Sequence, residues 1–251
     1  MKKNIPIMAD HWLKLLICLV VVANTQVDGA GHVLELGGLK SYVTGPKDSK
    51  ISVILASDVY GYKVPHLRQI ADKVGAAGYY TLVPDFFKGD PFVSNDPKKP
   101  FNAWFKKHLP EKGIDDAKPL IEALKSKGIA KIGAAGFCWG GKVTVDLTKS
   151  PYVQAAVLLH PTYVTVEDIQ GVKVPISFLG GQNDTSASPS LLKQFESTMK
   201  AKRPKVHSFV KIFSGAKHGW TTKYNDTDAA AVKRAKTAHK DMLNWFNKYL
   251  K

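Results

Sequence analysis

The chain is poor in cysteine and in arginine. Its 251 residues include two cysteines and three arginines, although the formal net charge is +15, so lysine carries nearly all of the positive charge. The lysines are scattered, with no basic run interleaved with aromatic residues. Nucleic-acid-binding surfaces usually concentrate their charge and use arginine for bidentate contacts. We therefore expect a solvated lysine-rich surface and no nucleic-acid partner.

The sequence also lacks patterns that are typical of metal binding. No two of its eight histidines have the spacing of a metal site, and there is no cysteine cluster. The composition is 44% hydrophobic and 23% charged, with no internal repeat, which is typical of an ordinary globular protein. We expect no metal and no cofactor.

No apolar run near the N-terminus is long enough to cross a bilayer, which needs about twenty apolar residues. Residues 15–23 are apolar, lysines precede them at positions 2 and 3, and polar residues follow. This pattern is typical of a secretory signal peptide. We expect residues 1–30 to form a signal peptide and short leader, and residues 31–251 to form a secreted (extracellular or apoplastic) domain without a membrane span. An N-terminal helix or signal anchor, with a cytoplasmic location, is the alternative.

Cleavage of such a signal near Ala23 would remove Cys18 and leave Cys138 as the only thiol of the mature chain. No intramolecular disulfide is then possible.

From about residue 33, short β-rich runs alternate with helical patterns. This order predicts one α/β domain with a mainly parallel sheet and helices on both of its faces. The expected strands are 33–43 (a strand or hairpin turning at residues 37–38), 51–56, 80–83, 129–135, 153–159, 174–179 and 206–213. The expected helices are 67–77, a helix capped by residue 115 or 116 and ending at 128, 141–148, 190–200, and a long amphipathic helix over 232–249. A polar and aromatic loop is expected over 86–110, where a substrate site is often shaped.

The strongest local signal is the sequence GFCWGG at residues 136–141, between a predicted strand and a predicted helix. It fits the G-x-S-x-G pattern of a nucleophile elbow, with Cys138 in place of serine. The nucleophile of such an elbow has a strained backbone, and only glycine two residues to either side avoids clashes. The turn also places the thiol at a helix N-terminus, where the dipole favours a thiolate. We predict that Cys138 is a nucleophile rather than a buried structural cysteine.

An acid and a histidine follow in the order that such an elbow requires. Asp184 comes just after one predicted strand, and His218 lies between the last predicted strand and the final helix. The order nucleophile, acid, histidine is that of α/β-hydrolases, and all three positions fall at the carboxyl ends of strands. We predict that Cys138, Asp184 and His218 form a catalytic triad. The backbone N–H groups of Trp139 and Val59 are expected to form the oxyanion hole.

His160 also follows a predicted strand, but it comes too early in the chain to be the base of the triad. We expect the His160 side chain to line the pocket or to contact a residue of the triad without touching the substrate. The candidate pocket residues are Tyr60, Lys88, Trp104, His160, Trp220 and Lys223. The aromatic residues of 86–110 either line a pocket or pack this loop onto the domain, and the sequence leaves both interpretations open.

At these residues the chain resembles the dienelactone hydrolase family, most closely its plant members and their animal carboxymethylenebutenolidase relatives. The matching stretches are SDVYG at 57–61, VPDFFKGD at 83–90, GFCWGG at 136–141, GGQND at 180–184 and HGW at 218–220. The resemblance covers nearly the whole chain after about residue 31. It implies a compact α/β-hydrolase fold with no large lid domain, and the same triad.

The chain departs from the bacterial members of this family at three positions. Asp58 stands where those enzymes carry a glutamate that helps to ionise the thiol, and we expect Asp58 to activate the nucleophile or to support it from behind. Lys88 and Lys223 lie in the regions where those enzymes use arginines to hold a substrate carboxylate. Lysine cannot give the bidentate geometry of arginine. The resemblance therefore implies some other ester or lactone rather than dienelactone itself.

The expected function is hydrolysis of a small-molecule ester or lactone by a monomer, through an acyl-thioenzyme intermediate. One alternative is a cell-wall β-glucan hydrolase of the same family. Glycosidases normally use two carboxylates, and the candidate pairs here are Asp58 with Asp85 or with Asp184. The other alternative is a ligand-binding protein that retains a hydrolase scaffold.

Overall fold

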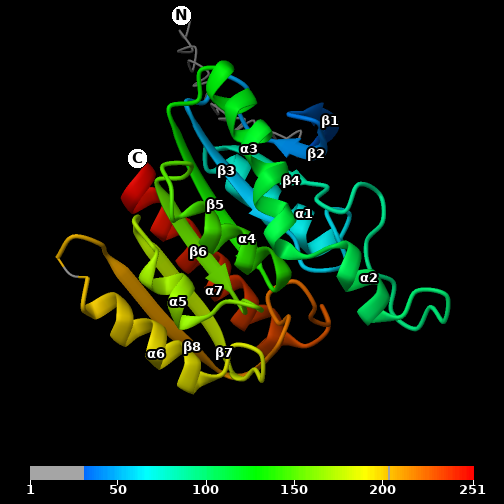
Figure 1. Cartoon of the computed structure of the whole chain (residues 1–251), viewed down its shortest axis with the longest axis vertical. Coiled ribbons are helices and arrows are strands. Elements are labelled where there is room, and N and C mark those ends of the chain that lie inside the picture. The colour runs from blue at the N-terminus through cyan, green and yellow to red at the C-terminus, as the bar shows by residue number, and fades with distance from the viewer. Residues whose placement is uncertain (1–30, 203) are drawn as a thin grey trace, which may run out of the picture.

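A twisted sheet of eight strands organises the part of the chain that the computed structural model describes, residues 31–202 and 204–251 (Figure 1). The predicted signal peptide at 1–30 lies outside the described residues. The strands are β1 His32–Leu36, β2 Leu39–Thr44, β3 Ile51–Ala56, β4 Tyr80–Pro84, β5 Lys131–Phe137, β6 Ala155–Leu159, β7 Ile176–Asn183 and β8 Ser208–Lys217. The helices are α1 Pro65–Ala76, α2 Phe101–Lys107, α3 Pro110–Ser126, α4 Trp139–Leu147, α5 Val166–Gln170, α6 Pro189–Lys200 and α7 Ala229–Leu250.

The strands follow the order β1-β2-β4-β3-β5-β6-β7-β8. The first two form an antiparallel hairpin turning at Gly37 and Gly38, whose φ angles of 58° and 79° suit glycine. β2 pairs antiparallel with β4, and the remaining neighbours are parallel. Because parallel strands have their carboxyl ends at one edge, the residues that follow β3, β5, β6, β7 and β8 gather there.

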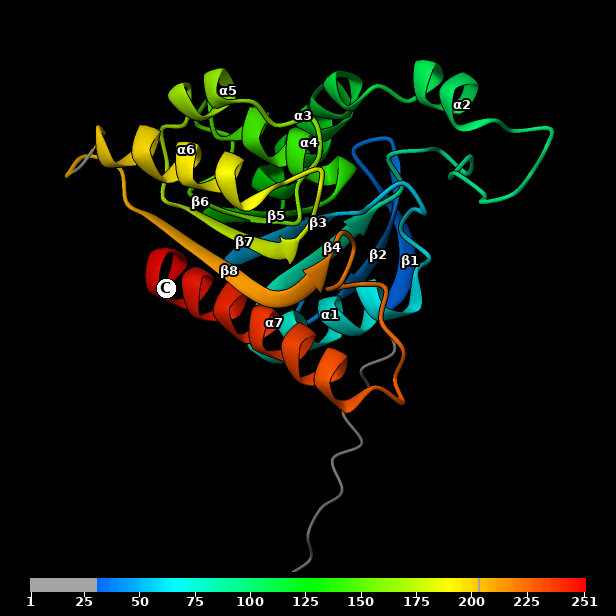
Figure 2. The same ribbon diagram turned by 90° about the horizontal axis from the view of Figure 1, so that it is seen from below.

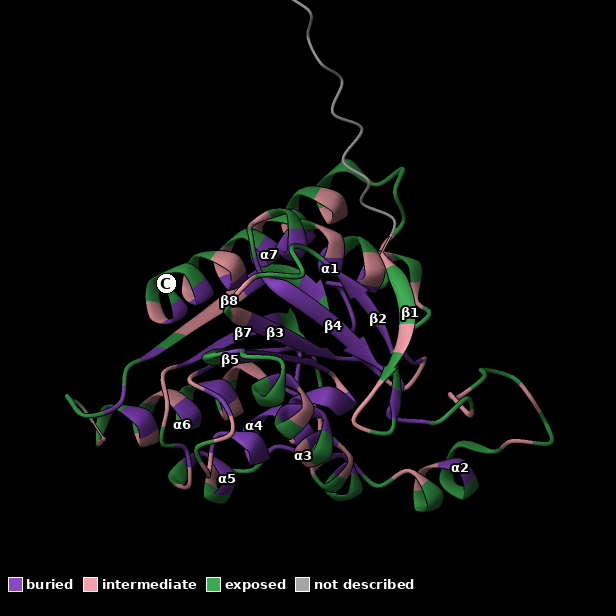
Figure 3. Cartoon of the chain, turned by 90° about the horizontal axis from the view of Figure 1, so that it is seen from above, coloured by how far each residue is buried: buried purple, intermediate pink, exposed green. Residues whose placement is uncertain are grey.

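Helices cover both faces of the sheet. Figure 2 shows α1 and α7 on one face and α3, α4, α5 and α6 on the other, while α2 projects to the side. Every residue of β4 and β6 is buried, and Figure 3 shows the central strands as the most enclosed part of the chain. Near-continuous apolar runs are expected of parallel strands that have helices on both sides. The predicted fold class is therefore confirmed.

Five elements differ from the sequence-based expectation. The expected loop at 86–110 contains α2, and α3 begins at Pro110 rather than at residue 115 or 116, because proline suits the first position of a helix. The short helix α5 was not predicted, and a capping box between Thr165 and Asp168 begins it. Strands β7 and β8 run on to Asn183 and Lys217. Their longer ends bring Asp184 and His218 directly to the sheet edge.

No helix among the described residues is long and apolar enough to cross a membrane.

Candidate active site

Cys138 occupies a sharp turn between β5 and α4. Its φ of 52° and ψ of −112° lie in a region that non-glycine residues rarely adopt. The glycines on either side permit the turn, since a Cβ at Gly136 would lie 2.1 Å from the Gly140 carbonyl oxygen. A Cβ at Gly140 would lie 2.1 Å from the Ala56 carbonyl oxygen. The turn is thus packed directly against the end of β3, which fixes the half-buried thiol in place.

Replacing Gly140 with alanine is expected to lower the free energy of unfolding by about 3 kcal/mol or more, because backbone atoms must move to admit the methyl group. For a chain of this size, thermal unfolding should show a fall in Tm of roughly 6 to 12 °C. Gly171→Ala is the matched control, since φ at Gly171 is −77° and its nearest contact, at 3.1 Å, is the flexible Lys149 side chain. Equal Tm values for the two variants would contradict the close packing at Gly140.

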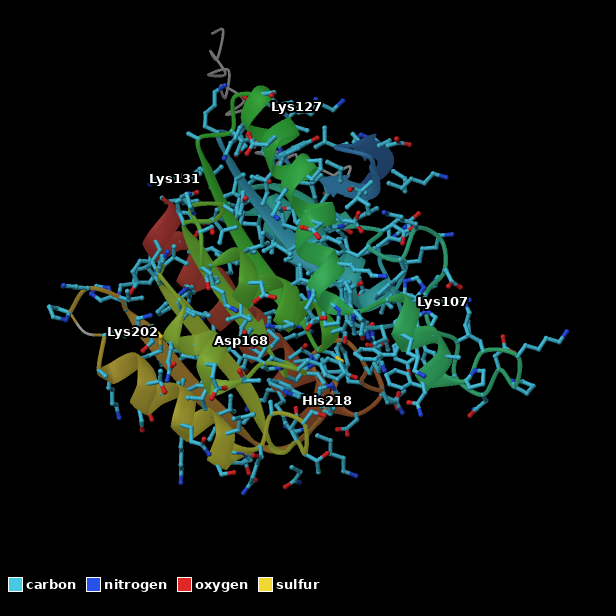
Figure 4. All side chains as sticks on the ribbon, in the orientation of Figure 1. Lys107, Lys127, Lys131, Asp168, Lys202 and His218 are labelled. Atoms are coloured by element: carbon cyan, nitrogen blue, oxygen red, sulfur yellow. The ribbon has the colours of Figure 1, made fainter. Side chains whose placement is uncertain are left out.

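Asp184 and His218 form a hydrogen-bonded pair at the ends of β7 and β8. The Nδ1 of His218 lies 2.9 and 3.0 Å from the two carboxylate oxygens of Asp184. One of these oxygens also accepts the backbone N–H groups of Ser186 (2.8 Å) and Ala187 (3.0 Å). Burial alone would raise the pKa of Asp184, but the hydrogen bonds from His218 and these N–H groups hold it below its usual value. A charged Asp184 keeps a proton on Nδ1 and turns Nε2 toward the elbow (Figure 4 labels His218).

The side chains of His218 and Cys138 interact directly, and the hydroxyl of Thr162 contacts both of them. Thr162 Oγ1 lies 3.3 Å from Nε2 and 3.5 Å from Sγ. Burial lowers the pKa of His218, but the interactions with Asp184 and Cys138 outweigh it and raise the pKa to about 10. The sequence pointed to His160 in this loop but not to Thr162. The signal that could have identified Thr162 is its position three residues after the last residue of β6, near the carboxyl end of a strand.

The two proposed oxyanion donors come from the elbow and from the loop after β3, whose Ser57 carbonyl oxygen accepts the N–H of Gly140 (3.1 Å). Trp139 is the first residue of α4, where backbone N–H groups lack partners within the helix. Among the described residues, none accepts a hydrogen bond from the N–H of Val59, whose carbonyl oxygen accepts from Phe92 N (2.9 Å). The indole of Trp139 is buried and donates to the carbonyl oxygen of His108 (2.8 Å). Its side chain therefore anchors the 86–110 segment.

Asp58 is buried beside the site, with both carboxylate oxygens bonded to groups other than the thiol. One accepts Tyr60 N–H (2.9 Å) and the other accepts the hydroxyl of Thr222 (3.2 Å). Burial raises the pKa of Asp58 above its usual value, although the charge of Lys223 and these hydrogen bonds oppose the shift. A role for Asp58 in activating Cys138 stays a prediction.

His160 lies behind His218. Its side chain is fully buried, its Nε2 lies 2.6 Å from Thr221 Oγ1, and its ring centre is 5.2 Å from that of His218 in an edge-on arrangement. Burial, reinforced by the charge of His218, lowers the pKa of His160 to about 3, so its ring is neutral. A neutral ring in this position suits contact with the triad rather than proton transfer.

The other pocket candidates lie in different environments in the structure. Lys223 Nζ lies 3.4 Å from the centre of the Tyr60 ring. Lys88 is exposed and pairs with Asp116 at 2.8 Å. Two indoles are buried. Trp104 donates to the Asp90 carbonyl oxygen (2.7 Å) and packs against neighbouring aromatic rings, and the ring of Trp220 is tilted against that of Phe213 with their centres 4.5 Å apart. These contacts favour packing rather than pocket-lining roles for both tryptophans.

Within residues 31–202 and 204–251, no three His, Cys, Asp or Glu side chains are grouped so as to hold a metal ion. The groups that come together at the elbow are a thiol, an imidazole, a carboxylate and backbone N–H groups.

Comparison with known proteins places this arrangement in a family. The sequence model of the dienelactone hydrolase family matches residues 39–250. A carboxymethylenebutenolidase homolog of Mus musculus is 33% identical over 232 residues, which are 90% of this chain and 94% of that protein. A Zea mays protein named endo-1,3;1,4-beta-D-glucanase is 48% identical over 172 residues, 68% of this chain but only 55% of the maize protein.

The fold likewise recurs in solved structures. A dienelactone hydrolase candidate from Klebsiella pneumoniae superposes with a TM-score of 0.70 at 21% identity, over 84% of this chain and 93% of that one.

Proposed function

Because this chain belongs to the dienelactone hydrolase family, we propose that it hydrolyses small esters or lactones with a Cys138–His218–Asp184 triad. One observation carries the proposal: a cysteine with a strained backbone sits at the elbow, and its thiol shares a hydroxyl partner with a histidine that a buried aspartate holds. The name of the mouse relative points to lactones as one class of substrate.

The reaction begins when the thiolate of Cys138 attacks the carbonyl carbon of the substrate. The N–H groups of Trp139 and Val59 stabilise the oxyanion that forms. His218, as an imidazolium held by Asp184, protonates the departing alkoxide and leaves a thioester on Cys138. Neutral His218 then removes a proton from water, the hydroxide attacks the thioester, and the carboxylic acid departs. The thiolate of Cys138 is expelled in this step and the proton taken from water stays on His218, which restores the thiolate–imidazolium pair.

A panel of aryl esters, alkyl esters and lactones, run with and without prior alkylation by iodoacetamide, tests this proposal. We expect turnover of at least one class, and near-complete loss of it after alkylation. Mass spectrometry should find the modification on Cys138. Turnover that survives complete alkylation of Cys138 would contradict a thiol mechanism.

The pH profile of kcat/KM should reflect the protonation of His218 in the free enzyme. The pKa of His218 is raised to about 10, so the imidazolium is present below that pH and is lost as the pH rises through it. For an ethyl ester, we expect kcat/KM to fall on the alkaline side with a midpoint of about 10.

A p-nitrophenyl ester is the control for this profile, because its leaving group needs no protonation and its alkaline fall should be weaker. Spontaneous hydrolysis is subtracted with enzyme-free samples. An ethyl ester profile that already falls near neutral pH would contradict the assignment of the acid to His218.

Cell-wall β-glucan hydrolysis is a second candidate, and the name of the maize relative is the observation that favours it. Glycosidases place two carboxylates across the sugar bond. Asp58 and Asp184 are each only 2% exposed, and both are already bonded to protein groups. Release of reducing sugar from a mixed-linkage glucan by enzyme alkylated at Cys138 would favour this candidate over the esterase.

We also propose that residues 1–30 direct secretion and that the mature protein is a monomer. Sequencing the N-terminus of protein recovered from the medium of expressing cells tests the first, and light scattering coupled to gel filtration tests the second.

A further inference from the structure

We propose that Thr162 is a further catalytic residue, whose hydroxyl passes the proton from the Cys138 thiol to His218 and then donates a hydrogen bond to the thiolate. This inference rests on the proposed function, since it concerns how that nucleophile becomes ionised. The motifs of the chain do not include Thr162, and only the folded arrangement brings it to the elbow.

The hydroxyl of Thr162 contacts both groups that must exchange a proton, and so offers a path beside the direct interaction of His218 with Cys138. Its oxygen lies 3.5 Å from Cys138 Sγ and 3.3 Å from His218 Nε2. Because Asp184 accepts the proton of Nδ1, the Nε2 of a neutral imidazole presents a lone pair. A hydroxyl has one donor and two acceptor positions, so it can accept from the thiol and donate to Nε2 at the same time.

The proton transfer needs no reactant other than the side chains of Cys138, Thr162 and His218. The S–H bond of Cys138 breaks as its proton bonds to Thr162 Oγ1, and the original hydroxyl proton moves from Oγ1 to Nε2 of His218. The products are a thiolate, a neutral hydroxyl and an imidazolium. The hydroxyl now donates to Sγ, and the imidazolium N–H donates to Oγ1. Hydrogen bonds to charged groups are stronger than those between neutral groups, so this arrangement favours the ion pair.

Backbone contacts tie Thr162 to the elbow. The N–H of Thr162 donates to the carbonyl oxygen of Cys138 (3.0 Å), and the N–H of Gly141 donates to the same oxygen (2.9 Å). Pro161 lies so close to α4 that a Cβ at Gly141 would be 2.6 Å from its Cβ. The position of Thr162 relative to Cys138 is therefore set by the main chain, and a change of side chain at 162 leaves it in place.

The residues on either side of Pro161 and Thr162 have unusual backbone angles. His160 has a φ of 38° and Tyr163 a φ of 63°, both in the left-handed region that disfavours side chains. Tyr163 is further held by Phe105, whose ring centre lies 4.7 Å away in a stacked arrangement. Backbone strain of this kind persists only where the surroundings enforce it. Here the strained angles of His160 and Tyr163 flank the turn that places the Thr162 hydroxyl beside Cys138.

The test compares Thr162→Val, which removes the hydroxyl but keeps the branched shape, with Thr162→Ser, which keeps the hydroxyl. The first readout is the rate of alkylation of Cys138 by iodoacetamide as a function of pH, followed on the Cys138 peptide by mass spectrometry so that Cys18 does not interfere. We expect the midpoint in Thr162→Val to rise by about one pH unit relative to the unmodified chain. Thr162→Ser should stay close to the unmodified chain.

The second readout is turnover at neutral pH. Thr162→Val should lose about tenfold to a hundredfold in kcat/KM, whereas Thr162→Ser should keep it within about threefold. The other titratable groups around the pair, which are Asp58, His160, Tyr163, Asp184 and Lys223, are unchanged in both variants. If Thr162→Val fails to fold, Thr162→Ala carries the same expectation, since its backbone bond to Cys138 is retained.

An alkylation profile and a turnover in Thr162→Val that match the unmodified chain would overturn the proposal. Equal losses in Thr162→Val and Thr162→Ser would also overturn it, because the hydroxyl would then not be the determinant. The alkylation experiment uses no substrate, so it tests Thr162 even if the proposed esterase function is wrong. Failure of that function would instead be seen as full turnover in a chain that lacks the Cys138 thiol.

Discussion

Replacing Cys138 with alanine is expected to lower kcat/KM for aryl ester hydrolysis by about 10⁵-fold or more. The thiol is the atom that becomes acylated, and alanine offers no nucleophile in its place. The measurement is turnover of p-nitrophenyl acetate, together with a search for the acylated Cys138 peptide in samples quenched during turnover. Acylation should be present in the unmodified chain and absent from the variant.

The fold should survive this change, which makes the loss specific to the chemistry. Alanine keeps the Cβ that already tolerates the φ of 52° at this position, and the backbone bonds of the elbow are unaffected. The Tm should therefore stay close to that of the unmodified chain. Cys138→Ser is the informative companion, since it supplies a weaker nucleophile in the same place. Turnover in Cys138→Ala comparable to that of the unmodified chain would refute the triad.

Replacing Asp184 with asparagine is expected to lower kcat by about 10⁴-fold, the size of effect that this change has in a serine-protease triad. Asparagine keeps the shape of the side chain but removes the charge that stabilises the imidazolium of His218. Without that charge the pKa of His218 falls from about 10, so the alkaline limb of the pH profile should move to lower pH. Steady-state kinetics over the same pH range as for the unmodified chain measure both effects.

The chain offers a matched control for this substitution. Asp226 also pairs with a histidine, His66, at 3.2 Å, but its side chain is 75% exposed and remote from the elbow in the sequence. Asp226→Asn should leave kcat and the alkaline limb unchanged. A kcat in Asp184→Asn within tenfold of the unmodified chain would show that His218 does not depend on this carboxylate.

The sheet and the elbow could be predicted from the sequence because they rest on local patterns. Parallel strands that are buried on both faces give continuous apolar runs. A nucleophile elbow has a fixed glycine spacing that can be read from sequence, although the atom nearest to a Cβ at Gly140 belongs to Ala56 of β3. The positions of Asp184 and His218 could be predicted because each of them follows a predicted strand. These features depend on residues close in the chain or on simple topology.

Thr162 and α2 could not be predicted in this way. Thr162 meets Cys138 and His218 across separations of 24 and 56 residues, and a threonine carries no pattern that marks it as a contact. Helix α2 forms where the ring of Phe101 stacks 5.6 Å from that of Phe105, and Trp104 is buried against the domain. Tertiary packing, rather than helix propensity, favours such a short helix.

Trp139 joins the elbow to the 86–110 segment. Its backbone N–H is a proposed oxyanion donor, while its indole donates to the carbonyl oxygen of His108 in that segment. The same segment reaches the surroundings of the elbow at two further points, since Phe92 N–H donates to the carbonyl oxygen of Val59 and the Phe105 ring stacks on Tyr163. A substitution that displaces His108, Phe92 or Phe105 is therefore expected to change the reaction chemistry together with the range of acyl groups that fit.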